Sequence, residues 1–410
     1  MPVMQSPPGA ETVIDGRRYL YFAGTGYLGL QGHAEVIRTA CEATRRYGLA
    51  SATTRTGFGN TPPVLDVERQ AARLFGTDDS FYFVSGYVGN HVFVLVLEGS
   101  FDAVLVDEHS HYCVFEAARL TARPTVSFRH RDPEDLRARL RRELKPRERP
   151  LVLSDGVFAG LGDIAPVAEY RSVLGEYPGA ILLVDDAHAV GVLGENGRGT
   201  FEHAGLWYPR AALADEQLVA PGDPSKPLAD EQPMAPAPQV NSELPGQGSA
   251  AAGPVLLVCG TLSKAIGGFG GIVPGSRRFI ERVKGSSRLY GGASPPPIPA
   301  AAATARALEL VLADPGIRKR LWQNARTLKR GLRRLGLPAD DSPVPIACLQ
   351  LGDPAAMRRI QEELMRRGIL IAYMPAYSGL GPEGALRLAV FATHTEAMIE
   401  QLLDELSRLL

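Results

Sequence analysis

The chain has 410 residues, of which 45% are hydrophobic and 22% charged, and this is ordinary for a soluble globular protein with one large or two medium domains. The 44 basic and 45 acidic residues leave a net charge of -1, so the charge balance points neither to nucleic acid nor to a membrane surface. The four cysteines are scattered without a CxxC pair, which argues against a disulfide framework and against a metal site of the zinc type.

The N-terminal residues MPVMQSPPGAETVIDG lack a basic start followed by an apolar run, so we expect no signal peptide. No apolar stretch approaches the roughly 20 residues of a transmembrane helix. We therefore expect no membrane partner and, by default, a cytoplasmic location.

Short apolar runs bounded by turn residues predict strands that are buried on both faces. Helix-like patterns, such as residues 133–145, lie between them, and this alternation predicts a mostly parallel sheet covered by helices on both sides. The predicted strands are Phe81–Val84, Ala103–Val106, Leu151–Leu153, Ile181–Val184 and Val255–Val258.

The C-terminal part has a different pattern. Amphipathic or Ala/Leu-rich runs predict helices, and two apolar runs between them predict strands, which together indicate a smaller α+β domain. We expect an N-terminal arm at 1–45, a large domain at 46–295 and a small domain at 296–410. The helices are expected at Ala300–Leu312, Pro354–Arg367 and Thr395–Leu410, and the strands at Ile369–Tyr373 and Leu386–Phe391.

Residues 209–254 do not fit the strand–helix pattern. This stretch of 46 residues holds nine prolines, and the octet ADEQLVAP at 214–221 returns as ADEQPMAP at 229–236. A Pro-rich, weakly apolar segment buries too little surface to offset the entropy of ordering it. We expect a disordered or loosely ordered surface insertion, with a docking tail as the alternative.

The first polar patch along the chain is FVSGYVGNH at 83–91. A predicted strand ends there in Ser85, Gly86 and Tyr87, and a predicted helix follows. A helix N-terminus after a Gly-containing turn can bind phosphate through backbone N–H groups. Many strand–helix turns look the same, so the motif is weak by itself.

The second patch, VDEHSHYCVFEAARL at 106–120, places His109 and His111 after another strand. A flat imidazole can stack on a heteroaromatic ring, although an isolated histidine is more often a packing or surface residue.

The third patch is VDDAHAVGVLGENGRG, where a buried strand runs into Asp185, Asp186 and His188. The carboxyl ends of strands are where α/β sheets bind ligands. An aspartate there could hold a protonated ring nitrogen, such as the pyridinium of pyridoxal 5'-phosphate (PLP). The alternative is a metal-binding or capping pair, but further metal ligands are missing.

The fourth patch is VLLVCGTLSKAIGGFGG at 255–271. A buried strand is followed by Thr261, Ser263 and Lys264 and then by several glycines. A lysine at the edge of an apolar strand is partly desolvated, which favours a nucleophilic neutral amine. Alone, Lys264 could be a solvated turn residue. Four such patches at strand ends, however, predict one pocket that collects them.

The order of these motifs, together with YLGL at 27–30 and LRL at 386–388, resembles fold-type I PLP-dependent enzymes. Within these the chain is similar to the α-oxoamine synthase group, which includes 8-amino-7-oxononanoate synthase, 2-amino-3-ketobutyrate CoA ligase and serine palmitoyltransferase. The resemblance covers nearly the whole chain except the insertion. It implies PLP as cofactor and a homodimer with a shared active site.

The resemblance also implies roles around the cofactor ring. Lys264 matches the lysine that forms the Schiff base with PLP, and Asp185 matches the carboxylate facing the pyridine nitrogen. His188 matches the histidine bonded to the phenolic oxygen. His111 matches the histidine stacked on the ring, where it can also polarise an incoming thioester carbonyl.

Further roles concern the phosphate and the substrate. The Gly86–Tyr87 turn and Thr261 match phosphate-binding groups. Ser294 resembles a phosphate contact from the other subunit, if the alignment is shifted by one residue. Arg387 matches the arginine that receives the substrate carboxylate, a task for which its planar fork is suited.

Two positions depart from the family pattern. The family usually has Asn or a close relative at the position of Thr25 and His at the position of Val64, and both positions lie near the substrate side of the family's site. Cofactor binding is therefore better supported than the identity of the substrate.

The implied reaction condenses an amino acid with an acyl-CoA thioester, with loss of CO2, to an α-amino ketone, and Lys264 acts as general base. An aminotransferase would use the same cofactor residues, and the sequence separates the two only weakly. A catalytically silent, regulatory member of the fold is a third reading, against which the presence of Lys264, Asp185 and His188 argues.

Overall fold

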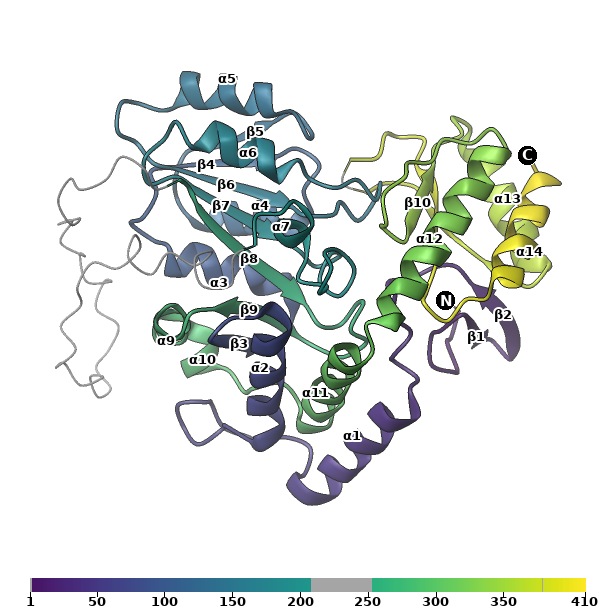
Figure 1. Cartoon of the computed structure of the whole chain (residues 1–410), viewed down its shortest axis with the longest axis horizontal. Coiled ribbons are helices and arrows are strands. Elements are labelled where there is room, and N and C mark those ends of the chain that lie inside the picture. Colours follow the sequence, from purple (N-terminus) through teal and green to yellow (C-terminus); the bar gives the residue numbers. More distant parts are fainter. Residues whose placement is uncertain (1, 208–252, 378) are drawn as a thin grey trace.

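A computed structural model describes residues 2–207, 253–377 and 379–410. In Figure 1 a large sheet with helices on both faces lies beside a smaller region that contains both described ends of the chain. The expected insertion at 209–254 falls outside the described residues, apart from its last two positions.

The large sheet has seven strands in the order β3-β9-β8-β7-β6-β4-β5. Among these strands β9 alone runs antiparallel to its neighbours, so the predicted mostly parallel sheet is confirmed. The strands are β3 (Asp79–Phe83), β4 (Ala103–Asp107), β5 (Thr125–Phe128), β6 (Pro150–Asp155), β7 (Ile181–Asp185), β8 (Val255–Thr261) and β9 (Gly271–Gly275).

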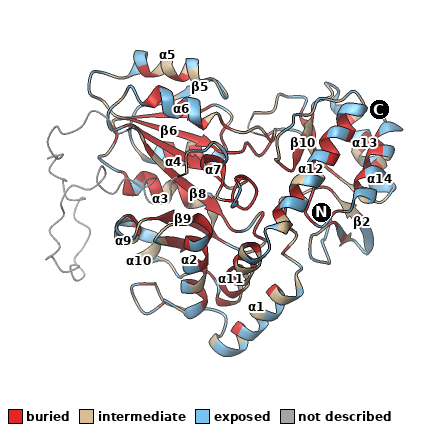
Figure 2. Ribbon diagram, viewed as in Figure 1, coloured by how far each residue is buried: buried red, intermediate tan, exposed pale blue. Residues whose placement is uncertain are grey.

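The central strands are apolar at successive positions because helices cover both faces of the sheet. Every residue of β4, β6 and β7 is buried, and Figure 2 shows the sheet buried along its length. One core packs α3 (Gly89–Val96), α4 (Tyr112–Leu120) and α9 (Arg277–Ser286) against one face. The opposite core contains α5 (Pro133–Glu143), α6 (Val167–Leu174) and α7 (Thr200–His203).

The boundary of α5 illustrates how local chemistry sets these elements. Asp132 caps the helix by accepting a hydrogen bond from the backbone N–H of Asp135 at 2.9 Å. Pro133 follows at the first helical position, where a missing N–H costs nothing. The helix begins at the predicted residue and ends two residues before the predicted Lys145.

The C-terminal region forms a small antiparallel sheet, β10-β13-β12, packed by helices. The expected single strand at 369–373 is instead two strands in different sheets, because β11 pairs with β2 whereas β12 pairs with β13. The elements are α11 (Ile298–Ala313), α12 (Gly316–Arg334), β10 (Ile346–Leu349), α13 (Pro354–Arg366), β11 (Ile369–Leu370), β12 (Ala372–Met374), β13 (Ala385–Ala389) and α14 (Glu396–Ser407).

The N-terminal segment is divided between the two regions. β1 (Glu11–Ile14) pairs with β2 (Arg17–Tyr21), and β2 pairs in parallel with β11. In contrast, α1 (Ala34–Tyr47) and α2 (Pro62–Phe75) pack against α11 beside the large sheet. The domain boundaries at 45 and 295 remain predictions. No described helix is long and apolar enough to cross a membrane.

A buried ion pair ties α2 to the loop before it. The Arg55 guanidinium donates to both carboxylate oxygens of Glu68, at 2.5 and 2.9 Å, and both side chains are almost fully buried. Glu68 also accepts from the backbone N–H of Tyr82 on β3 at 3.0 Å, and Lys284 Nζ lies 3.3 Å from it. The pair therefore links four segments, namely the loop before α2, α2 itself, β3 and α9.

We predict that Glu68→Ala lowers the free energy of unfolding by about 3 kcal/mol or more, because it leaves the Arg55 charge buried without its partner. Urea denaturation followed by circular dichroism measures the change. Glu11→Ala is the matched control, since it removes the exposed ion pair with Arg18 and is expected to shift stability by no more than about 0.5 kcal/mol. Equal effects of the two variants would contradict the prediction.

Candidate active site

The site begins with three residues at the carboxyl ends of neighbouring strands. Parallel pairing places Asp155 of β6 opposite Asp185 of β7, and Asp185 opposite Cys259 of β8. Both aspartates are buried, so two carboxyl groups lie side by side in an apolar surrounding.

Asp185 accepts hydrogen bonds from three donors. One is the thiol of Cys113, whose sulfur lies 3.7 Å from Oδ2. The side-chain amide of Asn90 on α3 donates to Oδ2 at 2.7 Å, and the backbone N–H of Ala187 donates to Oδ1 at 3.0 Å. Asn90 is itself buried. The family pattern contained this asparagine, but the sequence did not assign it a role, because a partner 95 residues away is not visible from local pattern. The amide fixes the orientation of the carboxylate.

Asp155 is a further site residue that sequence reasoning missed. Its carboxyl oxygens each lie 3.3 Å from the backbone N–H of His111. Burial and the neighbouring negative charge of Asp185 raise the pKa of Asp155 well above its usual value. The strand LVLSD was predicted to end before Ser154, so the aspartate was not recognised as part of the strand end.

Lys264 lies in the turn after β8, between the buried residues Leu262 and Ala265. Burial lowers the pKa of its ammonium group, and the nearby carboxylates of Asp185 and Asp155 partly oppose this effect. A neutral, nucleophilic amine is thereby favoured at neutral pH more than for an exposed lysine.

His188 lies in the turn after β7. Its Nδ1 is 2.8 Å from the hydroxyl of Tyr27, which in turn accepts from a guanidinium nitrogen of Arg387 on β13 at 3.0 Å. Burial, together with the positive charges of Lys264 and Arg387, lowers the pKa of His188 well below its usual value. The ring is therefore neutral.

His111 caps the N-terminus of α4. Its Nδ1 accepts from the backbone N–H of Cys113 at 3.3 Å and lies 3.0 Å from the sulfur of the same residue. Because the backbone N–H can only donate, it favours the tautomer of the neutral ring that has its proton on Nε2. Its pKa is lowered by burial and by the charge of Lys264. Three tyrosine rings surround the imidazole, with centroids within 6.1 Å: Tyr87, Tyr112 and Tyr377.

The turn Ser85–Tyr87 packs closely against Thr261. Residues 86–88 form a single 3-10 turn, whose start is capped by the hydroxyl of Ser85 accepting from the N–H of Tyr87. A Cβ on Gly86 would lie 2.5 Å from Cβ of Thr261 and 2.8 Å from its hydroxyl oxygen. Glycine is thus required here by close approach, which keeps backbone N–H groups and the Thr261 hydroxyl together.

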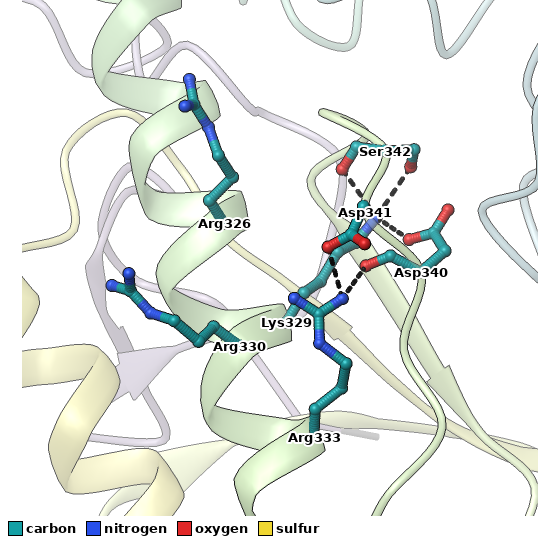
Figure 3. Close-up of a pocket in the computed structure, with 7 residues that line it drawn as sticks. All are labelled: Arg326, Lys329, Arg330, Arg333, Asp340, Asp341 and Ser342. Carbon is teal, nitrogen blue, oxygen red and sulfur yellow. Dashed lines mark hydrogen bonds and ion pairs between the residues drawn. The ribbon is translucent and has the colours of Figure 1, made fainter.

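Away from these strand ends, a hollow on α12 is lined by basic and acidic side chains (Figure 3). The buried Lys329 reaches across it to Asp340 and to Ser342, whose hydroxyl oxygen is 2.8 Å from Nζ. This lysine anchors the segment before β10. The hollow contains none of the predicted site residues.

The sequence profile described as aminotransferase class I and II matches residues 20–406. The chain belongs to this family. A curated relative named 8-amino-7-oxononanoate synthase, from Cellvibrio japonicus, is 35% identical over 100% of this chain and 91% of the relative. One of the same name from Nitrosococcus oceani is 32% identical, over 100% and 96%. These homologues are α-oxoamine synthases, as the sequence resemblance predicted.

A solved structure supports the same grouping. A serine palmitoyltransferase variant from S. paucimobilis with bound PLP–myriocin aldimine superposes with a TM-score of 0.83. It is 25% identical, and the match covers 100% of this chain and 92% of that one. The fold-type I architecture is therefore confirmed for this member of the family.

The sequence also singled out Ser294, Val64 and Thr25. Ser294 is exposed between α10 (Arg288–Gly292) and α11, and its expected role, which needs a second subunit, stays a prediction. Val64, where the α-oxoamine synthases usually have His, is fully buried in the core under α2. Thr25 lies two residues before Tyr27 and is half-buried.

We predict that Gly86→Ala destabilises the protein by about 1–3 kcal/mol, because the added methyl group must displace Thr261 or the turn. Gly285→Ala is the matched control, since a Cβ at this position in α9 meets nothing within 4 Å. That change is expected to be neutral or to stabilise by up to about 1 kcal/mol. Urea denaturation of both variants checks the difference, and a tolerated Gly86→Ala would refute the close approach.

Proposed function

We propose that the protein is a PLP-dependent acyltransferase that condenses an amino acid with an acyl-CoA thioester, with decarboxylation, to an α-amino ketone. The homology to α-oxoamine synthases supports the reaction class. The observation that carries the proposal is the half-buried side chain of Lys264 in the turn after β8, where desolvation lowers the pKa of the amine and the charge of Asp185 acts on it.

The side chains at the strand ends fit the functional groups of PLP. Asp185 offers a carboxylate to the pyridine nitrogen, and His188 offers a ring nitrogen to the phenolic oxygen. The close-packed Gly86 turn offers backbone N–H donors to the phosphate, and Lys264 offers the amine for the aldehyde. Thr261 lies against this turn, but its hydroxyl proton is donated to the carbonyl of Gly270 at 2.9 Å. Bound PLP supplies an electron sink for the electron pair released when a bond to the substrate α-carbon breaks.

Lys264 has the properties of a general base. Because burial lowers its pKa, its Nζ is available to accept a proton from the α-carbon and to return it later. The nearby carboxylates of Asp155 and Asp185 stabilise the resulting ammonium charge. Asn90 keeps Asp185 oriented while the local charge changes.

His111 is suited to act on the acyl donor. Its Nδ1 accepts from the N–H of Cys113, which favours a proton on Nε2 that the ring can donate to a thioester carbonyl oxygen. The rings of Tyr87 and Tyr112 lie beside the imidazole, and both side chains are exposed.

The proposal assigns Arg387 to the substrate carboxylate. Its hydrogen bonds within the protein leave only some of its N–H donors for this role. Three of its N–H groups donate to the carbonyls of Ala159 and Gly24 and to Tyr27. A guanidinium has five donors in all, so two remain. A homodimer in which Ser294 reaches the partner's site and a cytoplasmic location are further parts of this proposal.

We predict that Lys264→Ala abolishes covalent attachment of PLP that borohydride reduction makes permanent, because no other amine replaces Nζ at this position. Mass spectrometry of the reduced, digested protein locates the modified peptide. Lys319→Ala, at an exposed lysine, is the control and should retain the modification at Lys264. Reduced cofactor still attached to the Lys264→Ala protein would overturn the assignment.

We also predict that free CoA appears only when an amino acid and an acyl-CoA are both present. A thiol reagent that reports free CoA, applied to a panel of amino acids and acyl chain lengths, measures this and names the substrates. Turnover that depends on a keto acid, with no CoA release from any acyl-CoA, would instead establish the aminotransferase reading. Absence of both would favour a catalytically silent protein.

A further inference from the structure

Tyr27 is a fully buried residue with a hydroxyl between two charged or titratable groups. Its oxygen is 3.0 Å from Nη2 of Arg387 and 2.8 Å from Nδ1 of His188. The hydroxyl thus connects a strand of the C-terminal region with the histidine that follows β7.

The direction of these two hydrogen bonds follows from the chemistry of the partners. Guanidinium nitrogens can only donate, so the Tyr27 oxygen accepts from Arg387. The phenolic proton then needs an acceptor, because burying an unpaired hydroxyl is costly. Nδ1 of His188 is the acceptor available among the described residues. Burial raises the pKa of Tyr27, so its proton is retained.

The consequence for His188 is a fixed tautomer. A nitrogen that accepts a hydrogen bond carries no proton, and the neutral ring then has its proton on Nε2. Burial and the positive charges of Lys264 and Arg387 oppose a second proton on the ring, as would His111 if it were protonated. Nε2 has no hydrogen-bond partner among residues 2–207, 253–377 and 379–410, so its N–H is free to donate to a bound group.

The position of the Tyr27 hydroxyl is itself fixed. The backbone N–H of Ala392 donates to the carbonyl of Tyr27 at 2.7 Å, and the N–H of Tyr27 donates to the carbonyl of Thr25 at 2.9 Å. Arg387 is anchored separately by the carbonyls of Ala159 and Gly24. Neither Tyr27 nor Arg387 can turn without breaking these contacts.

We infer that Tyr27 is a positioning residue for His188. Because Arg387 can only donate to the Tyr27 hydroxyl, this hydroxyl donates to Nδ1 of His188, and Nε2 of His188 is then a hydrogen-bond donor to the cofactor. The tautomer follows from the chain's own contacts. The second part, that the donor meets the phenolic oxygen of PLP, rests on the proposed function.

The tautomer can be tested without any cofactor by nitrogen NMR of the histidine-labelled protein, with His188→Gln to identify the signals. We expect Nδ1 of His188 to be unprotonated and Nε2 protonated in the wild type. In Tyr27→Phe, which keeps the ring and removes the hydroxyl, we expect a mixture of both tautomers.

Tyr21→Phe is the matched control. Tyr21 also lies close enough to Arg387 to feel its charge, but it does not contact His188. It should leave the wild-type pattern unchanged. A proton on Nδ1 in the wild type would overturn the inference even if Tyr27→Phe failed to fold, and so would an unchanged pattern in a folded Tyr27→Phe.

The hydrogen bond from His188 to the cofactor is tested separately, by pH titration of the visible absorption of the PLP-loaded protein. A donor to the phenolic oxygen stabilises its anionic form and lowers the proton affinity of the chromophore. Loss of a reliable donor in Tyr27→Phe should raise the midpoint by about one pH unit, and Tyr21→Phe should not.

The two measurements separate two kinds of failure. If Tyr27→Phe altered the tautomer of His188 but left the midpoint of the absorption titration unshifted, only the hydrogen bond from His188 to the cofactor would be overturned. Failure of the wild-type protein to bind PLP would refute the proposed function and that link, but would leave the NMR result on Tyr27 intact.

Discussion

The site depends on the register of three parallel strands. Because β6, β7 and β8 are aligned, the carboxyl groups of Asp155 and Asp185 meet at one level, inside a core that excludes water. Two buried carboxyl groups are unfavourable unless a cation, a proton or a donor compensates them. Lys264, Asn90 and the backbone N–H of His111 supply these compensations, and among them Lys264 is also the group that would carry the chemistry.

Much of this could be predicted because strand-end motifs are local. The buried runs that end at Asp185 and Thr261 identified two strands and their polar ends from the sequence, and the family pattern then assigned roles. Contacts between distant segments were not predictable in this way. Asn90 bonds to Asp185, and Tyr27 to His188 across 161 residues, and neither pairing leaves a periodic signal. The split of residues 369–374 into two sheets has the same cause, since their partners decide it.

Arg387 has two duties that compete for its donors. The sequence resemblance assigned it to a substrate carboxylate, whereas the structure places it as an anchor for Ala159, Gly24 and Tyr27. A rigid, planar fork with several donors is well suited to hold three segments at once. The same side chain therefore couples the geometry of the cofactor side to the region expected to receive the amino acid.

The pairing of β2 with β11 has a consequence for how the chain is made. Leu20 lies opposite Ile369, so an early strand must wait for a partner that leaves the ribosome almost 350 residues later. Pairing of segments so far apart in the chain is slow, because it costs conformational entropy to bring them together. Tyr27 and Arg387 are 360 residues apart in the chain. Their hydrogen bond, and with it the contact of Arg387 through Tyr27 to His188, is therefore formed only after the strands of the large sheet have been synthesised. The order of synthesis delays a competent site until the last sheet has closed.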